Sequence, residues 1–218
     1  WLATVSGIDW PKTKVSGKSA AEINTKREQQ KQELIDILDK MKAGNMNAVC
    51  MQVRSLSDAM YVSSYEPWSV ALTGTRGKDP GYDPLQFAID EAHKRGMELH
   101  VWVNPFRVST GSLSSSDVLW SNAGDWLIKY NNDSFSGYII DPGYPESRAY
   151  VVKVLMEIVN KYDIDGMVMD DYFYAYGGTT NEDIKAQQLH YNAAEVVDVN
   201  NNGQTLDDWR RSNVDKVI

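Results

Sequence analysis

Two adjacent carboxylates stand at the end of an apolar run, in the stretch DGMVMDDYFYAYGG. Asp170 and Asp171 follow residues 167–169, and the aromatic residues Tyr172 and Tyr174 come directly afterwards. The apolar run predicts a buried strand, so both carboxylates are expected where that strand ends. Carboxyl groups can transfer protons or attack a substrate, and amphipathic rings can stack on flat, partly polar ligands. The stretch therefore predicts the floor of a binding or catalytic site.

The elements that must position this site alternate between strands and helices. Helix starts are marked by a capping box at Ser19 and Glu22 and by Asp83 followed by proline, and stops are marked by Gly44 and Gly96. We expect strands over residues 1–10, 48–54, 97–106 and 165–171, helices over 19–44, 83–96 and from 145 onwards, a short helix near 120–130, an extended piece at 137–145, and a helix in the final stretch DDWRRSNVDKVI. Strands separated by helices predict parallel pairing, hence an α/β fold.

The alternation within the strands distinguishes a barrel from an open sheet. Leu99, Val101 and Val103 share one face of their strand, whereas the opposite face carries His100 and Trp102. An open sheet covered by helices on both sides should be apolar on both faces. The interior of a TIM-type enzyme barrel instead becomes polar toward the carboxyl ends of its strands, where functional residues collect. The pattern therefore predicts a TIM (β/α)8-type barrel. Because only four main strands are expected, residues 1–218 are predicted to form a single domain that supplies about the N-terminal half of that barrel.

The same alternation selects the candidate site residues. Asp170 shares its parity with Gly166 and Val168 and is expected to point inward, whereas Asp171 is expected to point away or into the loop. The candidates for ligand contact are polar or aromatic residues at this mouth or on its rim: Gln52, Arg54, Asp58, Tyr61, Trp68, His100, Trp102, Asn104, Arg107, Asp141, Tyr172 and Tyr174. The alternative for each is a structural role, and Asp170 could instead cap a loop or pair with an arginine.

Composition excludes several classes of protein. The net charge is −8, from 22 basic and 30 acidic residues, and no basic cluster offsets it, which argues against a nucleic-acid partner. No apolar run approaches the roughly 20 residues of a membrane span. The single Cys50 excludes an internal disulfide, and three dispersed histidines argue against a zinc hydrolase. An excess of Trp and Tyr over Phe favours a surface that stacks on sugars.

A polar insert near the C-terminus partly resembles a calcium-binding loop. Asp198, Asn200 and Asn202 occupy positions 1, 3 and 5 of such a loop, and Gly203 occupies position 6. Position 12, which should be acidic, is Trp209. The insert therefore predicts either a calcium site or a solvated Asn-Gly turn, and no other cofactor is indicated.

Several consecutive motifs together resemble one protein family. The segments QVRSLSDAMYVSSYEPWS, DPLQFAIDEAHKRGMELHVWVNPFR, DPGYPESR, DGMVMDDYFY and DWRRSNVD resemble the glycosyl hydrolase-like 10 family, a bacterial TIM-barrel family. The resemblance implies an exported, periplasmic or surface protein, lipid-anchored in some forms, that acts on glycans such as peptidoglycan strands. One departure is Val168, where the family usually has a polar residue, often His.

These observations lead to one expected function and two rivals. We expect a glycoside hydrolase of a bacterial cell-wall or related polysaccharide, with Asp170 as one catalytic carboxyl group, Asp171 as a second candidate, and the true second group on a later strand. A non-catalytic glycan-binding barrel would keep the aromatic and amide residues without needing a second carboxylate. A metal-dependent hydrolase using Asp170, Asp171 and His100 is the third reading, and its ligand spacing is poor. The sequence does not indicate protein partners.

Overall fold

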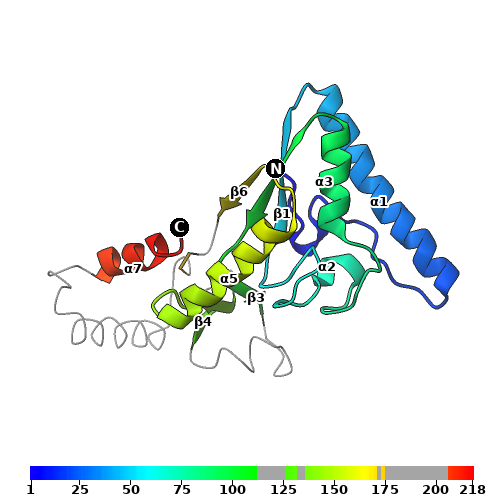
Figure 1. The fold of residues 1–218 in the computed structure, drawn as a ribbon. Coiled ribbons are helices and arrows are strands. Elements are labelled where there is room, and N and C mark those ends of the chain that lie inside the picture. Colours follow the sequence, from blue (N-terminus) through cyan, green and yellow to red (C-terminus); the bar gives the residue numbers. More distant parts are fainter. Residues whose placement is uncertain (112–125, 132–135, 171–172, 175–205) are drawn as a thin grey trace. The chain divides into compact units, whose positions relative to one another are not determined.

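A computed structural model describes residues 1–111, 126–131, 136–170, 173–174 and 206–218 (Figure 1). The chain is an α/β protein whose contacts divide into two compact units. The first unit comprises Trp1–Asn104 with Glu157–Asp170, and the second comprises Pro105–Met156 with Asp171–Ile218. None of the helices in the described ranges is long and apolar enough to cross a membrane.

The long helices of the first unit begin and end where the sequence predicts. In α1 (Ala20–Ala43), the Ser19 side chain caps the helix by accepting a hydrogen bond from the Glu22 N–H at 3.2 Å. In α3 (Pro84–Lys94), the Asp83 carboxylate accepts from the N–H groups of the second and third helical residues, both at 3.1 Å. These caps satisfy donors that a helix start would otherwise leave open. The unit also contains the short helices η1 (Val5–Gly7) and α2 (Val70–Thr73).

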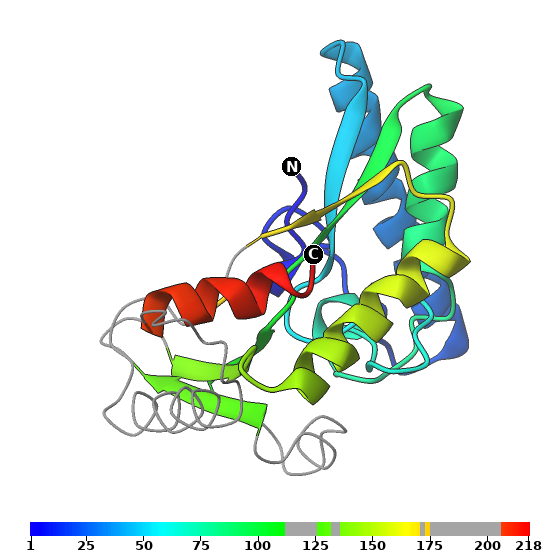
Figure 2. The same ribbon diagram turned by 60° about the vertical axis from the view of Figure 1, so that its left-hand side comes forward.

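A parallel three-stranded sheet forms the centre of the first unit. It contains β1 (Ala48–Arg54), β2 (Glu98–Val103) and β6 (Gly166–Met169) in the order β1-β2-β6. Helices α1 and α3 cover one face of β1 and β2 (Figures 1 and 2). The apolar residues buried in this layer are Leu34, Leu38, Val49, Met51, Val53, Leu85, Ala88, Ile89, Ala92, Leu99, Val101 and Val103. The expected helix-facing side of the strands is therefore the observed core side.

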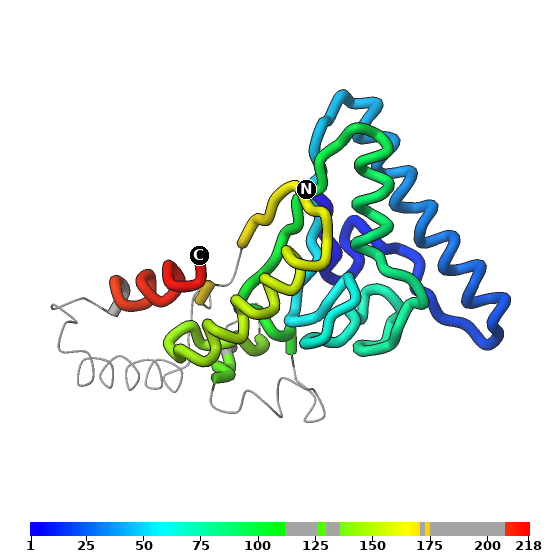
Figure 3. Tube along the Cα trace, in the orientation of Figure 1, coloured from blue at the N-terminus to red at the C-terminus, as the bar shows by residue number. Residues whose placement is uncertain are grey.

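The predicted strand over residues 1–10 is wrong for most of its length. Only Leu2 pairs with the sheet, through a parallel bridge to Met51, and the 3-10 helix Val5–Gly7 follows. In Figure 3 the blue tube after the N-terminus curls instead of running straight. Ser6 and Gly7 adopt positive φ angles of 54° and 67°, which turn the chain out of the extended conformation. The strand predicted over residues 1–10 did not include this turn.

The second unit contains an antiparallel sheet that the barrel prediction did not include. Strands β3 (Arg107–Thr110), β4 (Leu127–Asn131) and β5 (Ser136–Ile140) are ordered β3-β5-β4. The predicted helix near 120–130 is wrong over residues 127–130, because this segment pairs along its length with β5; residues 120–125 lie outside the described ranges. Helix α5 (Pro145–Lys161) belongs to this unit as far as Met156, and α7 (Leu206–Asp215) is its C-terminal helix. The expected extended piece is present only as far as Ile140, because the chain turns at Asp141 and α5 begins at Pro145. Both expected helices are present.

Candidate functional site

The face of the parallel sheet opposite the helices carries the predicted site residues. Gln52 in β1, Trp102 in β2 and Val168 in β6 lie side by side in register. A Cβ atom added to Gly166 would lie 2.4 Å from Nδ1 of His100, so these two positions also share the face. Alternation from Gly166 through Val168 places Asp170 on this same face.

The electrostatics of Cys50 agree with that placement. The pKa of its thiol is raised, mainly by burial; the N-terminal ammonium lowers this pKa, and the Asp170 carboxylate raises it further. Cys50 pairs with His100 in the sheet, so its side chain lies on the face opposite the helices. The Asp170 charge therefore acts on this face.

Asp170 itself is exposed, but its backbone is held firmly. Its N–H donates to the Val103 carbonyl at 3.0 Å, and its carbonyl accepts from Nδ2 of Asn104 at 2.5 Å. The carboxylate thus reaches solvent from a fixed point directly after β6. This is the arrangement expected of a group that meets a ligand at the carboxyl end of a parallel strand.

Two predicted ligand-contacting amides are buried and bonded within the protein. Gln52 and Asn104 are 1% and 0% exposed. The Gln52 Oε1 atom accepts from the N–H groups of Thr4 and Val5, both at 2.9 Å, and its Nε2 donates to Asn104 Oδ1 at 2.6 Å. Both amides therefore connect the N-terminal segment, β1, β2 and the end of β6.

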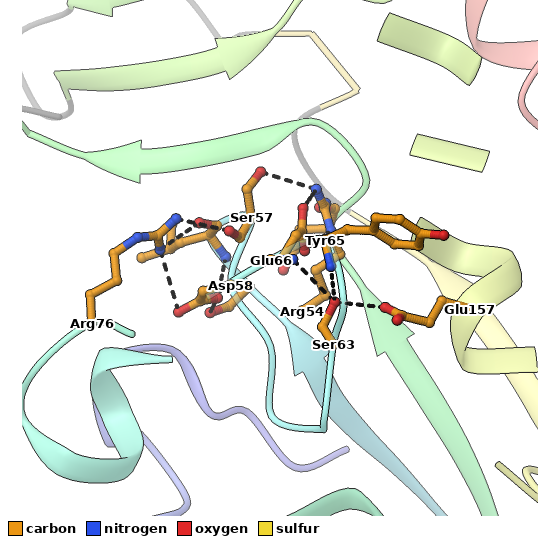
Figure 4. A network of polar contacts seen from close by, with 11 residues as sticks. Arg54, Ser57, Asp58, Ser63, Tyr65, Glu66, Arg76 and Glu157 are labelled. Carbon is orange, nitrogen blue, oxygen red and sulfur yellow. Dashed lines mark hydrogen bonds and ion pairs between the residues drawn. The ribbon is translucent and has the colours of Figure 1, made fainter. Parts of the chain in front are cut away.

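Arg54 forms a buried ion pair that sequence reasoning missed (Figure 4). Its Nε and Nη2 donate to Oε2 and Oε1 of Glu66 at 2.8 and 2.6 Å, and both side chains are 0% exposed. Its Nη1 donates to the Asn104 carbonyl at 2.6 Å. A buried arginine requires an acidic partner. The sequence offered that signal, but Glu66 and Asp58 lie in the same irregular loop and spacing could not choose between them.

The loop after β1 is fixed by further polar contacts. Asp58 is buried and accepts from the Leu56 N–H at 2.9 Å and from Ser55 Oγ at 3.1 Å, with Arg76 Nη1 at 3.9 Å from its second oxygen (Figure 4). Trp68 is half-buried, and its backbone forms a parallel bridge in this loop. Asp58 and Trp68 thus stabilise the loop in this structure, and a ligand contact by either remains a prediction.

The end of α5 anchors the same loop from another part of the chain. The Tyr162 hydroxyl donates to Asp83 Oδ2 at 2.6 Å and accepts from the Val62 N–H at 3.0 Å. Glu157 accepts from Ser63 Oγ at 2.6 Å and from the following backbone N–H at 2.7 Å. Tyr61 is fully buried against the Tyr162 ring, and burial raises the pKa of the Tyr61 hydroxyl well above its usual range. The predicted rim residue Tyr61 therefore lies in the core of the loop.

Trp102 and His100 on β2 are more accessible to solvent than the buried amides and Arg54. The Trp102 ring packs edge-on against Trp1, with centroids 5.2 Å apart, and remains half-buried. His100 is also half-exposed, and its Nε2 lies 2.9 Å from Oε2 of Glu98. Both occupy the predicted face, and Trp1 is an additional aromatic residue that the prediction did not include.

The remaining candidates belong to the second unit or lie outside the described residues. Asp141 is buried, and its Oδ1 accepts from the Gly143 N–H at 2.8 Å, which is the turn role considered as an alternative. Arg107 is the first residue of β3. The pKa of the Tyr174 hydroxyl is raised, mainly because the side chain is buried. Asp171, Tyr172 and the calcium candidates Asp198, Asn200 and Asn202 lie outside the described ranges. Within those ranges, no group of three or more His, Cys, Asp or Glu side chains could hold a metal ion.

Parallel strands joined by helices, with polar residues gathered where the strands end, define the chain as part of a (β/α)8-type barrel. Solved structures agree on the fold. A hypothetical protein from Ruminiclostridium thermocellum has a TM-score of 0.55 at 14% identity, covering 85% of this chain and 84% of its own. Alpha-L-fucosidase isoenzyme 2 from Paenibacillus thiaminolyticus has a TM-score of 0.52 at 14% identity, covering 86% of this chain and 25% of its own.

The chain belongs to the glycosyl hydrolase-like 10 family, whose model matches residues 1–218. Glycosyl hydrolase YngK of Bacillus subtilis is 42% identical over 222 residues, covering 100% of this chain and 40% of the relative. Glycosyl hydrolase DigH of Escherichia coli K12 is 36% identical over 230 residues, covering 100% of this chain and 49% of the relative. The chain therefore spans about half the length, or less, of these curated relatives.

Proposed function

We propose that the chain is part of a glycoside hydrolase and that Asp170 is one of its catalytic carboxyl groups. One observation carries this choice. In the first unit, the described carboxylates after the ends of parallel strands are Asp58, Glu66, Asp79 and Asp83, which lie between β1 and α3, and Asp170, which directly follows β6. Asp79 accepts from the Gly81 N–H next to α3, and Asp83 caps that helix. Asp58 and Glu66 are buried and ion-paired, whereas Asp170 is exposed and has a fixed backbone. A carboxylate that meets a substrate needs this combination of access and rigid placement.

The chemistry requires two carboxyl groups on either side of the scissile bond. One protonates the leaving oxygen, and the other attacks the sugar or activates water. Asp170 supplies one of these functions in our proposal, and a residue outside this chain supplies the other. Their separation would then set the stereochemical outcome, since retaining enzymes hold the two groups about 5–5.5 Å apart and inverting enzymes about 6.5–9.5 Å apart.

The proposed substrate is a polysaccharide of the bacterial cell wall or a related glycan, met in the periplasm or at the cell surface. Membership of a glycosyl hydrolase-like family supports a carbohydrate substrate. The Trp102 and Trp1 rings on the Asp170 face would support sugar stacking, because an aromatic ring matches the apolar face of a pyranose. In this proposal Asp171 acts on the adjacent loop rather than on the substrate.

Replacing Asp170 by Asn in the full-length protein tests the assignment. The amide keeps the size of the side chain but removes the charge and the exchangeable proton. We expect turnover of isolated glycan strands to fall by orders of magnitude, while glycan binding and the melting temperature change little. Asp171→Asn, the same substitution at the adjacent residue, is the control. It should reduce turnover less than Asp170→Asn, and any loss of turnover should parallel a loss of stability.

The outcomes separate the competing functions. Retained turnover in Asp170→Asn contradicts the catalytic assignment. If Asp171→Asn abolishes turnover and Asp170→Asn does not, the catalytic group is the neighbouring residue. If the unaltered protein binds glycan strands without cleaving them, the non-catalytic binding barrel is the correct function.

A further inference from the structure

The backbone of Asp170 is held in an unusual way at the end of β6. Its N–H continues the parallel ladder by donating to the Val103 carbonyl at 3.0 Å. In a regular parallel ladder, the Asp170 carbonyl would accept from the N–H of the residue two positions after Val103, which is residue 105. Residue 105 is proline and has no N–H. The side chain of Asn104 takes its place, with Nδ2 donating to the Asp170 carbonyl at 2.5 Å.

The orientation of the Asn104 amide is set by Gln52. Gln52 Oε1 accepts from two backbone N–H groups, those of Thr4 and Val5, so its Nε2 must face the other way. That Nε2 donates to Asn104 Oδ1 at 2.6 Å, which leaves Asn104 Nδ2 directed at the Asp170 carbonyl. Rotating either amide by half a turn would set donor against donor or acceptor against acceptor. The two amides therefore form a chain of hydrogen bonds with one direction.

The backbone of Asn104 is fixed as well. Its N–H donates to the Arg54 carbonyl at 2.8 Å, and its carbonyl accepts from Arg54 Nη1 at 2.6 Å. Arg54 is in turn held by two short hydrogen bonds to Glu66, in a pair of fully buried side chains. Charge-assisted bonds of this kind combine strength with a fixed geometry. Asn104 is thus rigid at the backbone and at the amide.

We propose that Asn104 and Gln52 are positioning residues that set the direction of the Asp170 carboxylate. Both were predicted as substrate ligands, but both are buried and their amides are bonded inside the protein. Holding the N–H and the carbonyl of Asp170 fixes its backbone dihedral angles, and these fix the direction in which the side chain leaves the sheet. The inference rests on the proposed catalytic role of Asp170.

The test compares kcat and KM of variants of the full-length protein on isolated glycan strands. Asn104→Ala removes the donor that replaces the missing ladder bond. We expect kcat to fall by roughly 10- to 100-fold, because a displacement of about 1 Å at a reacting group can cost about that much. KM should be unchanged, because a positioning residue does not touch the substrate.

A second variant avoids a cavity. Gln52→Glu keeps the acceptor for Thr4 and Val5 and nearly the same shape, but it presents an oxygen to Asn104 Oδ1. In its ionised form this carboxyl group has no donor, so the Asn104 amide must rotate and turn its own oxygen toward the Asp170 carbonyl. A protonated carboxyl group would instead donate to Asn104 Oδ1, so kcat is compared at pH values below and above the carboxyl pKa. We expect a fall in kcat of similar size with unchanged KM, although Asp170 and Asn104 are both unaltered.

Val101→Ala is the matched control. Val101 lies in the same strand, is 0% exposed, and faces the helix side. It should lower the melting temperature at least as much as the two amide variants and leave kcat unchanged. A fall in kcat with this control would show that lost stability alone explains the effect and would overturn the inference.

The remaining outcomes distinguish this inference from the proposed function. If Asp170→Asn abolishes turnover but the amide variants keep full kcat, the positioning role is refuted and the catalytic role stands. If the amide variants raise KM at unchanged kcat, Gln52 and Asn104 are substrate ligands instead. If Asp170→Asn itself retains turnover, both proposals are refuted.

Discussion

The buried Arg54–Glu66 ion pair makes a quantitative prediction about stability. Glu66→Gln removes one charge and one of the two acceptor oxygens from a pair whose side chains are both 0% exposed. The guanidinium would then remain buried without the charge of Glu66. Breaking such a pair by removing one partner costs about 3–5 kcal/mol. Since a domain is stabilised by only about 5–15 kcal/mol, this is a large share of the free energy of unfolding.

Urea denaturation followed by tryptophan fluorescence measures the effect. We expect the unfolding midpoint of Glu66→Gln to fall strongly, and the melting temperature to fall by about 6–20 °C, given a shift of about 2–4 °C per kcal/mol for a protein of this size. Arg54→Met combined with Glu66→Leu should recover part of the loss, because it also removes the buried charge of Arg54. Recovery should be incomplete, since Ser57 and the Asn104 carbonyl lose a donor.

A surface ion pair supplies the control. Lys31 and Glu28 are 3.1 Å apart on α1, with side chains 25% and 61% exposed. Glu28→Gln should cost less than about 0.5 kcal/mol, because water screens such pairs and compensates for their loss. A loss for Glu66→Gln no larger than that for Glu28→Gln would refute the conclusion that the Arg54–Glu66 pair is dehydrated.

Two further predictions concern contacts between distant segments. Tyr162→Phe should cost about 1–3 kcal/mol in urea denaturation, because it leaves the Val62 N–H without its acceptor and Asp83 Oδ2 without a donor; an unchanged midpoint would contradict this. The hydrogen bond from His93 is the main cause that lowers the pKa of Asp165. A depressed carboxyl pKa contributes stability that is present above the unfolded pKa and lost as pH falls through the folded pKa. His93→Leu removes this donor and should therefore raise the Asp165 pKa toward its ordinary range in an NMR titration, and the variant should lose less stability on acidification.

Local signals in the sequence predicted most elements of the first unit. A helix cap involves residues within one turn, so Ser19 and Asp83 could be identified with the positions they occupy in the structure. Strand alternation likewise placed His100 and Trp102 opposite the helix-facing side chains. What failed depended on remote partners. Residues 127–130 form a strand because β5 pairs with them, and the sequence of the segment alone did not show this.

The candidate site was predicted by position better than by role. Strand alternation placed Gln52, Arg54 and Asn104 near Asp170. It did not predict the hydrogen bonds that these side chains form within the protein. A register shift between Gln52 and Arg54 also interrupts the alternation on which the prediction relied. Bulges of this kind redirect side chains and have no dependable sequence signal. Polar residues on an inward face can bind a substrate or can form hydrogen bonds that support the binding site. Only the burial of each side chain in the structure distinguishes these two roles.

The pairing of β2 with β6 has a consequence for how the protein is made. Asn104 and Asp170 are 66 residues apart in sequence. At about 5–20 residues per second, a ribosome needs roughly 3–13 s to reach the second after completing the first. Throughout that interval β2 has an open parallel edge, and for most of it the loop after β1 lacks the anchors supplied by Glu157 and Tyr162. Open strand edges favour pairing with other chains. The nascent first unit is therefore exposed to misassociation for seconds, until β6 closes that edge.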